Sequence, residues 1–496
     1  MKENTPSIAR HLIRSGIVLS AVQLFTRAMG IVSALTVPRW LGPEEMGIFA
    51  VAILAITAIN AFTESGFVSA FMQRKADYEQ YIAPVRTINA LRGFALGLLI
   101  YLAAPYIAEL MNCPRATSVL KALALFPIVS GMTPMIWTIA AKRLLFAYYA
   151  KYNAFLTIVN LAITVPLAWH LKNVWALVTG MLVSSLIGLI ISTFLSREGR
   201  EFTFNLKPLK DLQSFSFWIF LTSIVYYLYI NVGNWFIGSL LDVQILAVYT
   251  LAFKFTTMFT GEAASIINRM MLPVFSHIQD DLPRVRVGFQ KSFGILAVVI
   301  VGVGSFFCVA AQDYFTIVLA EKWAVYTELF ISLLPWLTLW GVCSAFAGAQ
   351  SGVFQALGKP SRWMWSVVAK CVLMLLLVLP AVRFYDALGV AAVLGSVSVA
   401  MQFVRYFILS RMLQVSVLTI FSLVIAPAGA GIIAIAAATL SRGLITSNVW
   451  GQAVLANIVV VVTYIATLVA FSQFIYPNPL HLLKQARTYA MGKFKG

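Results

Sequence analysis

Charged side chains are scarce in this sequence. Asp, Glu, Lys and Arg make up 11% of its 496 residues, whereas a soluble domain carries roughly 25%. Apolar residues make up 60%, and the mean hydropathy is +0.88. A water-soluble fold could not cover this much apolar surface, so the composition excludes a soluble globular protein and predicts a chain that lives in a bilayer.

The chain also lacks the short motifs that carry enzyme chemistry. It contains no GxxxxGK[ST], HExxH, CxxC or GxSxG, so it has no P-loop for ATP hydrolysis and no familiar zinc or nucleophile motif. The wide spacing of its four cysteines favours burial as small apolar residues over disulfides or metal binding. These are Cys113, Cys308, Cys343 and Cys371. We predict no enzyme activity, no cofactor and no bound metal.

Long apolar runs make up most of the sequence. Fourteen stretches of 19 or more residues, separated by charged or Gly/Pro-containing breaks, are candidate membrane-spanning helices. They cover residues 15–38, 46–71, 88–110, 118–141, 152–170, 174–195, 214–238, 245–272, 289–312, 328–356, 363–382, 388–409, 417–440 and 449–475. The weakest divisions are HLKN, between the fifth and sixth spans, and RFYDALG, between the eleventh and twelfth. The first apolar run is too long for a cleaved signal peptide, so we interpret it as an uncleaved span.

The basic residues orient these spans. The net charge is +18, but Lys and Arg sit in short clusters between apolar runs, which indicates membrane topology and not nucleic-acid binding. One side of the predicted topology holds 26 of them and the other holds seven, with three inside spans. The richer side is predicted to be cytoplasmic. Both termini are then predicted to lie in the cytoplasm, in a multi-pass membrane protein.

An internal repeat divides the chain. The longest connection, Ser196–Gln213, has eighteen residues and separates six spans from six more and a final pair. Leu41–Ala52 and Leu241–Ala252 match at an offset of 200 residues, each opening the second span of its half. An even number of spans per unit gives a parallel repeat, typical of two-lobed transporters. We predict an all-α fold with an N-terminal lobe (1–205), a C-terminal lobe (206–412) and two extra helices with a basic tail (413–496).

Several polar residues fall inside the predicted spans. Arg27 lies mid-span on a stripe with Gln23, at a cost of ~3 kcal/mol or more in hydrocarbon. In a two-lobed transporter the polar residues inside the spans would line a water-filled cleft. Basic residues slightly outnumber acidic ones among them, which favours an anionic ligand such as phosphate. The candidate substrate contacts are Arg27, Gln23, Tyr227, Asn231, Lys254 and Arg269, and the candidate ion-coupling residues are Glu64 and Glu262.

Structural alternatives remain for the charged residues of this set. Arg27 paired with Glu64 would be a staple between helices, and Glu262 has the same alternative with Lys254 or Arg269. Lys370 and Arg405 lie near the predicted cytoplasmic ends of their spans, where we expect them to snorkel to the interface.

Four ordered segments carry a family resemblance. They are PRWLGPEEMGIFAVA (Pro38–Ala52), TESGFVSAFMQRK (Thr63–Lys75), MLPVFSHIQDD (Met271–Asp281) with the RVRVGFQKSFG that follows it, and LAEKW (Leu319–Trp323). With them the chain resembles the polysaccharide transporter family of the multidrug/oligosaccharidyl-lipid/polysaccharide (MOP) flippase superfamily, most closely the Wzx-like colanic-acid exporters.

The resemblance implies a flippase that moves polyprenyl-diphosphate-linked oligosaccharide across the inner membrane by alternating access. It implies the lipid-linked substrate, membrane lipids, a proton or sodium ion, and a polysaccharide polymerase with its co-polymerase as partners. Three other functions are kept open: a multidrug/cation antiporter of the same superfamily, a lipid II flippase, and, less favoured because no large periplasmic loop exists, a membrane polysaccharide polymerase.

Overall fold

A computed structural model describes residues 28–63, 66–73, 78–143, 145–195, 198–444 and 449–471, together with residues 22, 25 and 26. At some helical positions, Glu262 and Arg269 among them, it describes the backbone alone. The described chain is helical and contains no strand.

The first described helix covers Ala28–Leu41. The α-helices that follow are α2 (Pro43–Phe62), α3 (Phe67–Gln73), α4 (Ile82–Leu110), α5 (Ala116–Leu123), α6 (Leu125–Met132), α7 (Ile136–Lys142), α8 (Phe146–Leu171), α9 (Trp175–Leu195), α10 (Gln213–Leu240), α11 (Val243–His277), α12 (Leu282–Val318), α13 (Ala320–Trp323), α14 (Thr327–Ala356), α15 (Pro360–Leu413), α16 (Val417–Ser441) and α17 (Val449–Phe471). Short 3₁₀ turns are η1 (Tyr78–Tyr81), η2 (Lys207–Leu212), η3 (Ala324–Tyr326) and η4 (Arg442–Leu444).

Local sequence signals set several helix ends. The Asp281 side chain accepts a hydrogen bond from the Arg284 amide at 3.1 Å and opens α12, and Ser416 does the same for α16 through the Thr419 amide at 3.1 Å. Both are N-caps. α8 ends at Lys172, which adopts a left-handed φ of 51°. Lys172 belongs to HLKN, so the predicted break between the fifth and sixth spans is confirmed.

Helix α15 is a hairpin of two helices. Its regular geometry fails at Tyr385 and at Asp386, where φ is +51°, inside the RFYDALG break that the sequence predicts. Arg405 Nε donates to Ser366 Oγ at 3.2 Å, so residues 39 apart in sequence lie side by side. The two halves, 360–384 and 387–413, therefore run antiparallel.

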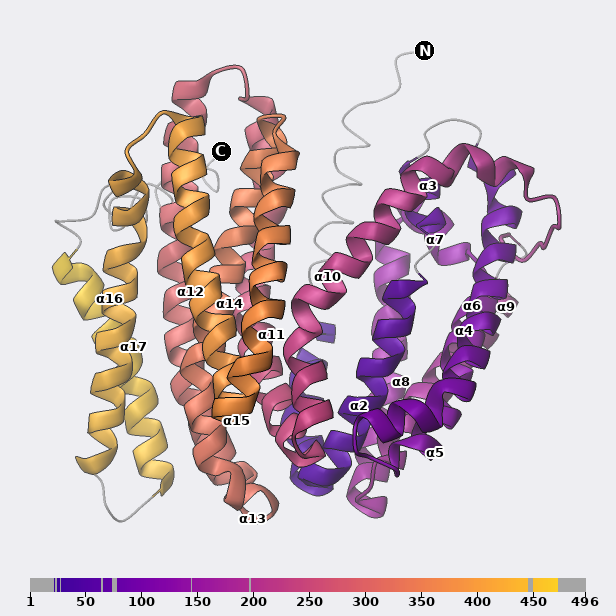
Figure 1. Ribbon diagram of the computed structural model, residues 1–496, viewed down its shortest axis with the longest axis horizontal. Helices are drawn as coiled ribbons and strands as arrows, with labels where there is room; N and C mark the ends of the chain where they lie inside the picture. Colours follow the sequence, from indigo (N-terminus) through magenta and orange to yellow (C-terminus); the bar gives the residue numbers. More distant parts are fainter. Residues whose placement is uncertain are drawn as a thin grey trace, which may run out of the picture. The chain divides into compact units, whose positions relative to one another are not determined.

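The chain divides into two compact units. Unit 1 holds the residues up to Asn231 together with Gly238–Ala247, and unit 2 holds Val232–Ile237 and the residues from Val248 onward. Unit 1 contains α2–α9 and most of α10, and unit 2 contains most of α11 and α12–α17 (Figure 1). The predicted lobe boundaries at residues 205 and 412 stay a prediction.

Membrane-spanning character is widespread in the described part of the chain. Nine helices there are long and apolar enough to cross a bilayer, or ten with a bent pair, and α15 counts once among them. The all-α membrane fold is thus confirmed, whereas the count of fourteen spans is not. Two predicted spans are interrupted. The span 46–71 stops at Phe62 and resumes as α3, and the span 118–141 bends by 52° between Met132 and Ile136.

The offset of 200 residues also relates helices outside the segment that suggested the repeat. Helix α11 begins 200 residues after α2, and α12 begins 200 residues after α4. Equivalent helices thus start at equivalent positions in both halves, as a parallel repeat predicts.

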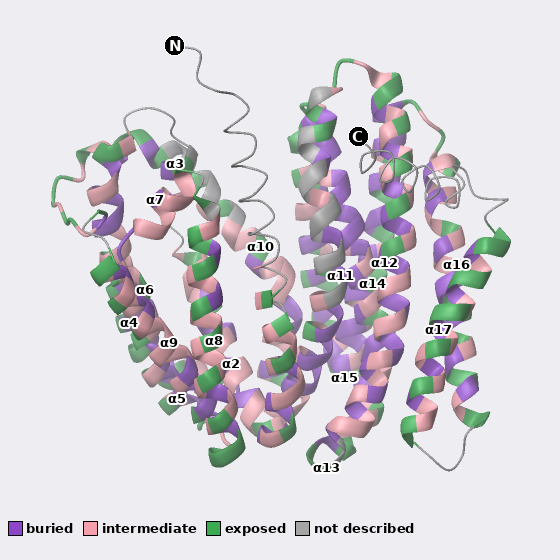
Figure 2. Ribbon diagram, turned by 180° about the vertical axis from the view of Figure 1, so that it is seen from behind, coloured by how far each residue is buried: buried purple, intermediate pink, exposed green. Residues whose placement is uncertain are grey.

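A large apolar core lies in unit 2. Phe289, Phe293 and Phe346 pack from α12 and α14, and the same cluster includes Leu423 of α16 and Val460 of α17. Figure 2 shows the buried residues as purple bands along these helices. The last two helices are therefore integral to the packing of unit 2.

An ion pair joins the end of α16 to α12. Arg442 Nη2 lies 2.7 Å from Asp313 Oδ1, and Asn457 of α17 donates to the second oxygen of Asp313 at 2.7 Å. Both charged side chains are largely buried, at 17% and 11% exposed. One carboxylate thereby links three helices of unit 2.

Candidate functional site: a polar cavity in unit 1

A large polar cavity lies inside unit 1, among α2–α4, α6–α9 and α10. Its volume is about 870 Å³, within the ~300–1,000 Å³ range of small-molecule sites. Its polar lining comes from asparagine, serine, threonine and tyrosine side chains and from one arginine. These are Asn60, Ser69, Asn89, Arg92, Ser130, Thr133, Thr138, Tyr149, Tyr152, Asn153, Ser184, Ser185 and Ser223.

Arg92 of α4 is the cation of this cavity. Its Nε donates to the Thr63 carbonyl at 2.7 Å, and its Nη2 donates to the backbone and side-chain oxygens of Asn60, each at 3.1 Å. Thr63 and Asn60 form the C-terminal end of α2, where the helix dipole is negative and carbonyls lack partners within the helix. These three acceptors are all neutral oxygens of the end of α2.

Other cations satisfy helix ends in the same way. Lys142 Nζ donates to the carbonyls of Phe71 and Met72, at the end of α3, at 2.6 and 3.3 Å. Arg86 donates to the Met132 carbonyl, at the end of α6, at 3.2 Å. Backbone groups released at membrane depth must find partners inside the protein. These basic side chains supply them, so Lys142 and Arg86 are structural residues and not merely solvated loop charges.

The helix breaks themselves follow from local sequence. Thr133 precedes Pro134 and adopts an extended backbone with ψ 128°, as the residue before proline prefers. Gly66, at φ +63°, precedes α3, a conformation that glycine adopts without strain. Both breaks lie beside the cavity, since Pro134 and Ser69 of α3 line it.

Glycines bring α4 and α6 together along one wall. A Cβ on Gly131 would stand 2.6 Å from the Asn89 carbonyl oxygen and 3.0 Å from the Gly93 Cα. No side chain could fit there, and such close backbone approach is typical of small residues between membrane helices. This contact fixes the spacing of the two helices that carry Arg92 and Ser130.

An aromatic pair forms another wall. The Trp137 and Tyr152 rings stack with centroids 3.9 Å apart and planes 16° apart. Trp137 Nε1 donates to Ser192 Oγ at 2.7 Å, and the Tyr152 hydroxyl lies 3.2 Å from the same oxygen. Ser192 is fully buried and holds both rings in place. The cavity therefore has a rigid, amphipathic surface beside its polar groups.

The charge of the lining favours an anion. Arg92 is the single charged residue among the described residues that line the cavity, and none of those residues is acidic. A guanidinium recognises phosphate well, and the amides and hydroxyls nearby are suited to hydrogen-bonding a sugar. The described lining offers no carboxylate to a cationic ligand.

The residues predicted from sequence are only partly placed. Arg27, Gln23 and Glu64 lie outside the described residues, and the side chains of Glu262 and Arg269 do so as well. Lys254 lies on α11 with an exposed side chain. None of the described residues that line the cavity belongs to the predicted set.

Tyr227 and Asn231 have structural contacts in unit 1. Tyr227 is 5% exposed, and its hydroxyl donates to the Leu54 carbonyl of α2 at 3.0 Å. Asn231 donates to the Tyr227 carbonyl one turn earlier at 3.2 Å. The Tyr227 bond ties α10 to α2, whereas the Asn231 bond lies within α10. A role for either residue in substrate binding stays a prediction.

Lys370 and Arg405 do not snorkel as expected. They are 1% and 2% exposed, so both are buried inside unit 2. The Arg405 guanidinium lies over the Trp363 ring at 4.8 Å and bonds to Ser366. The prediction was wrong because it used depth along the helix alone, whereas the helix face decides whether a long side chain reaches the interface.

Sequence reasoning missed Arg92, which it counted as a cytoplasmic topology charge. The available signal was the spacing of Asn89, Arg92, Gly93 and Leu96 along one face of α4.

Comparison with known proteins places the chain in a family. A family model for polysaccharide biosynthesis proteins matches residues 36–328, more than half of the sequence. The chain belongs to this family. The resemblance predicted from its four segments is confirmed, and the protein is a multi-pass membrane protein.

The relatives that match this chain share low sequence identity with it. The lipopolysaccharide biosynthesis protein WzxC of Escherichia coli (strain K12) is 21% identical over 60% of this chain and 60% of WzxC. An uncharacterized membrane protein in the cps region of Klebsiella pneumoniae is 24% identical over 60% of this chain and 61% of its own length. The teichuronic acid biosynthesis protein TuaB of Bacillus subtilis (strain 168) is 22% identical over 75% and 77%. The match thus spans about three fifths of the first two relatives.

Solved structures share the fold. The inward closed conformation of the lipid II flippase MurJ superposes with a TM-score of 0.69, covering 92% of this chain and 99% of MurJ at 14% identity. An inward-facing multidrug resistance MATE family transporter of the MOP superfamily gives 0.61, covering 80% and 97% at 16% identity. This chain therefore has the fold of MOP-superfamily transporters.

Proposed function

We propose that this chain transports a polyprenyl-diphosphate-linked oligosaccharide from the inner to the outer leaflet of a bacterial inner membrane, for the synthesis of a surface polysaccharide. The observation that carries the proposal is the cavity of unit 1, whose described lining pairs one arginine with many neutral hydrogen-bonding groups and offers no carboxylate. Membership of the polysaccharide biosynthesis family and the transporter fold support it.

The mechanism follows from the chemistry of such a substrate. Its lipid tail stays in the bilayer while the diphosphate and sugars require a polar path. Arg92 supplies a fixed positive charge for phosphate, and the amides and hydroxyls around it replace water around the sugars. Alternating access would carry the polar part across, with Arg27, Gln23, Lys254, Arg269, Tyr227 and Asn231 as further contacts. Glu64 and Glu262 would couple transport to a proton or sodium ion.

The test is polymer export in cells that depend on this chain. Arg92→Gln should lower export at least about tenfold, because a charge-assisted hydrogen bond contributes ~1.5–3 kcal/mol, and Arg92→Lys should retain part of it. Arg27→Ala should also abolish export. Arg39→Gln, an exposed arginine of unit 1 that does not line the cavity, is the matched control. Surface polymer and lipid-linked precursor are quantified at equal protein levels.

Other outcomes favour other functions. Cell lysis on depletion, in place of viable cells that lack one polymer, would indicate a lipid II flippase. Efflux of cationic drugs that survives Arg92→Gln would indicate a cation antiporter. Normal polymer export by the Arg92→Gln variant would contradict the proposal that the substrate passes through this cavity.

A further inference from the structure

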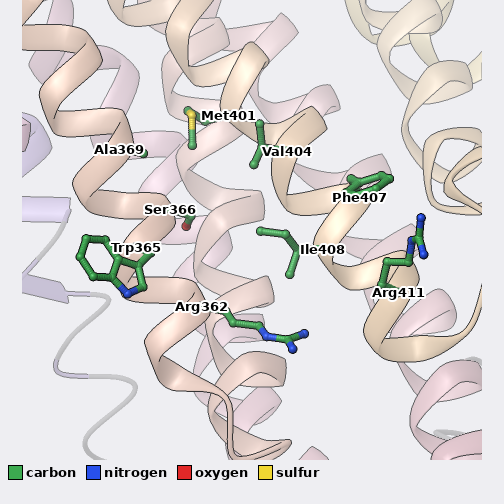
Figure 3. A pocket seen from close by; sticks show the side chains of 9 residues that line it. All are labelled: Arg362, Trp365, Ser366, Ala369, Met401, Val404, Phe407, Ile408 and Arg411. Atoms are coloured by element: carbon green, nitrogen blue, oxygen red, sulfur yellow. The ribbon is translucent and has the colours of Figure 1, made fainter.

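The α15 hairpin of unit 2 carries a second, different pocket. It is a groove of about 460 Å³ between the two antiparallel halves (Figure 3). The apolar lining includes Ala369, Met401, Val404, Phe407 and Ile408. Residues 401, 404, 408 and 411 fall on one face of their helix, as 362, 366 and 369 do on theirs. The groove is thus built by two matched helix faces.

Two arginines stand at one end of this groove. Arg362 lies in the first turn of α15 and Arg411 in its last turn, and the antiparallel arrangement brings both to the same end (Figure 3). Both side chains are exposed, and the Arg411 guanidinium lies over the Phe407 ring at 5.2 Å. No acidic residue is among the described residues that line the groove.

The opposite end of the hairpin has a different charge. Asp386, the single acidic residue of α15, lies at the turn together with Arg383. The excess of positive charge is therefore confined to the arginine end. That end belongs to the side that the distribution of Lys and Arg predicts to be cytoplasmic, where membranes expose anionic lipid headgroups.

We propose that this groove binds an anionic glycerophospholipid of the bilayer, with an acyl chain along the apolar wall and the phosphate between Arg362 and Arg411. The described residues that line the groove offer one hydroxyl, that of Ser366, and Arg405 already donates to it. A site for the sugars of a lipid-linked oligosaccharide needs many more polar groups, such as those in the cavity of unit 1. The lining therefore favours a lipid with a small charged headgroup.

The experiment measures lipid binding to the full-length purified protein. Native mass spectrometry would titrate phosphatidylglycerol and phosphatidylcholine with the same acyl chains. The double variant Arg362→Gln/Arg411→Gln should weaken phosphatidylglycerol binding about thirtyfold, since each basic residue near an anionic lipid contributes ~1 kcal/mol. Arg383→Gln, an exposed arginine at the other end of the same hairpin, should leave binding unchanged. Ala369→Trp, which fills the groove, should block it with both arginines present.

Three results would overturn the proposal. These are equal binding of the two lipids to the wild-type protein, an equal loss in Arg383→Gln, and preferential occupation of the arginine-dependent site by an isoprenoid diphosphate added as competitor. Circular dichroism and the lipid-free Tm of each variant separate loss of binding from loss of folding. Polymer export is measured apart from lipid binding, so failure of this proposal leaves the transport function untouched.

Discussion

Equivalent helices of the two units differ in continuity. α2 stops after 20 residues, whereas α11, which begins 200 positions later, runs for 35. The fourth predicted span is broken into α5, α6 and α7, whereas the tenth forms α14, with 30 unbroken residues. The ends of α2, α3 and α6 expose carbonyls that accept hydrogen bonds from Arg92, Lys142 and Arg86, respectively. In unit 1 polar groups therefore gather around the breaks and line a cavity, whereas unit 2 packs large side chains along unbroken helices.

The largest expected effect lies in the core of unit 2. Phe293 is 1% exposed and its ring contacts the rings of Phe289, Phe346 and Tyr406. Phe293→Ala should lower the free energy of unfolding by about 3–5 kcal/mol, because it leaves a cavity in a dense cluster. Denaturation in mixed micelles measures this loss, and hydrogen exchange should locate it in unit 2. Phe384→Ala, at a residue 78% exposed, is the control, and an equal loss there would contradict the packing argument.

A smaller effect is expected where unit 1 depends on small residues. Gly131→Val should lower the free energy of unfolding by about 1–3 kcal/mol, because the new side chain pushes α6 away from the Asn89 carbonyl of α4. Hydrogen exchange should rise in α4 and α6. Gly429→Val in α16 is the matched control, since no atom lies within 4 Å of its Cβ position. An equal loss of stability in Gly131→Val and Gly429→Val would contradict the prediction that unit 1 depends on the close approach of α4 and α6.

The smallest effect concerns a single helix end. Arg86 is 5% exposed and donates to the carbonyls of Met132 at 3.2 Å and Gly199 at 2.5 Å. Arg86→Gln should destabilise unit 1 by about 1.5 kcal/mol, the contribution of one charge-assisted hydrogen bond, and speed exchange near the end of α6. Lys151→Gln, at an exposed position of α8, should do neither. A null result for Arg86→Gln would mean that water serves this helix end equally well.

The sequence predicted the helices better than their interruptions. Hydropathy placed about half of the predicted spans within four residues of the ends of a described helix. HLKN and RFYDALG marked real breaks, because they combine polar residues with positive φ angles at Lys172 and Asp386. The breaks at Thr63–Gly66 and Thr133–Pro134 were missed. Apolar residues flank both of them, so average hydropathy hides a proline or glycine that interrupts the backbone.

The candidate site was less accessible to prediction. Arg92, Lys370 and Arg405 look alike in sequence, each a basic residue inside or near an apolar run. Their different environments come from which helix face meets which neighbour, a property of tertiary packing that spacing along one helix does not determine. Arg92 became a cavity residue because α2 ends beside it, and that ending was itself missed.

The segment after α9 is more than a connector. The Gly199 carbonyl accepts from Arg86, the Thr203 amide donates to Thr87, and Leu209 and Leu212 join a buried cluster with Phe71 and Tyr81. A tag or protease site inserted in this segment would therefore disrupt contacts that stabilise unit 1, which an insertion in an exposed loop would not do. The longest extramembrane stretch predicted for this chain packs against α3, α4 and α7, the helices beside the breaks of unit 1.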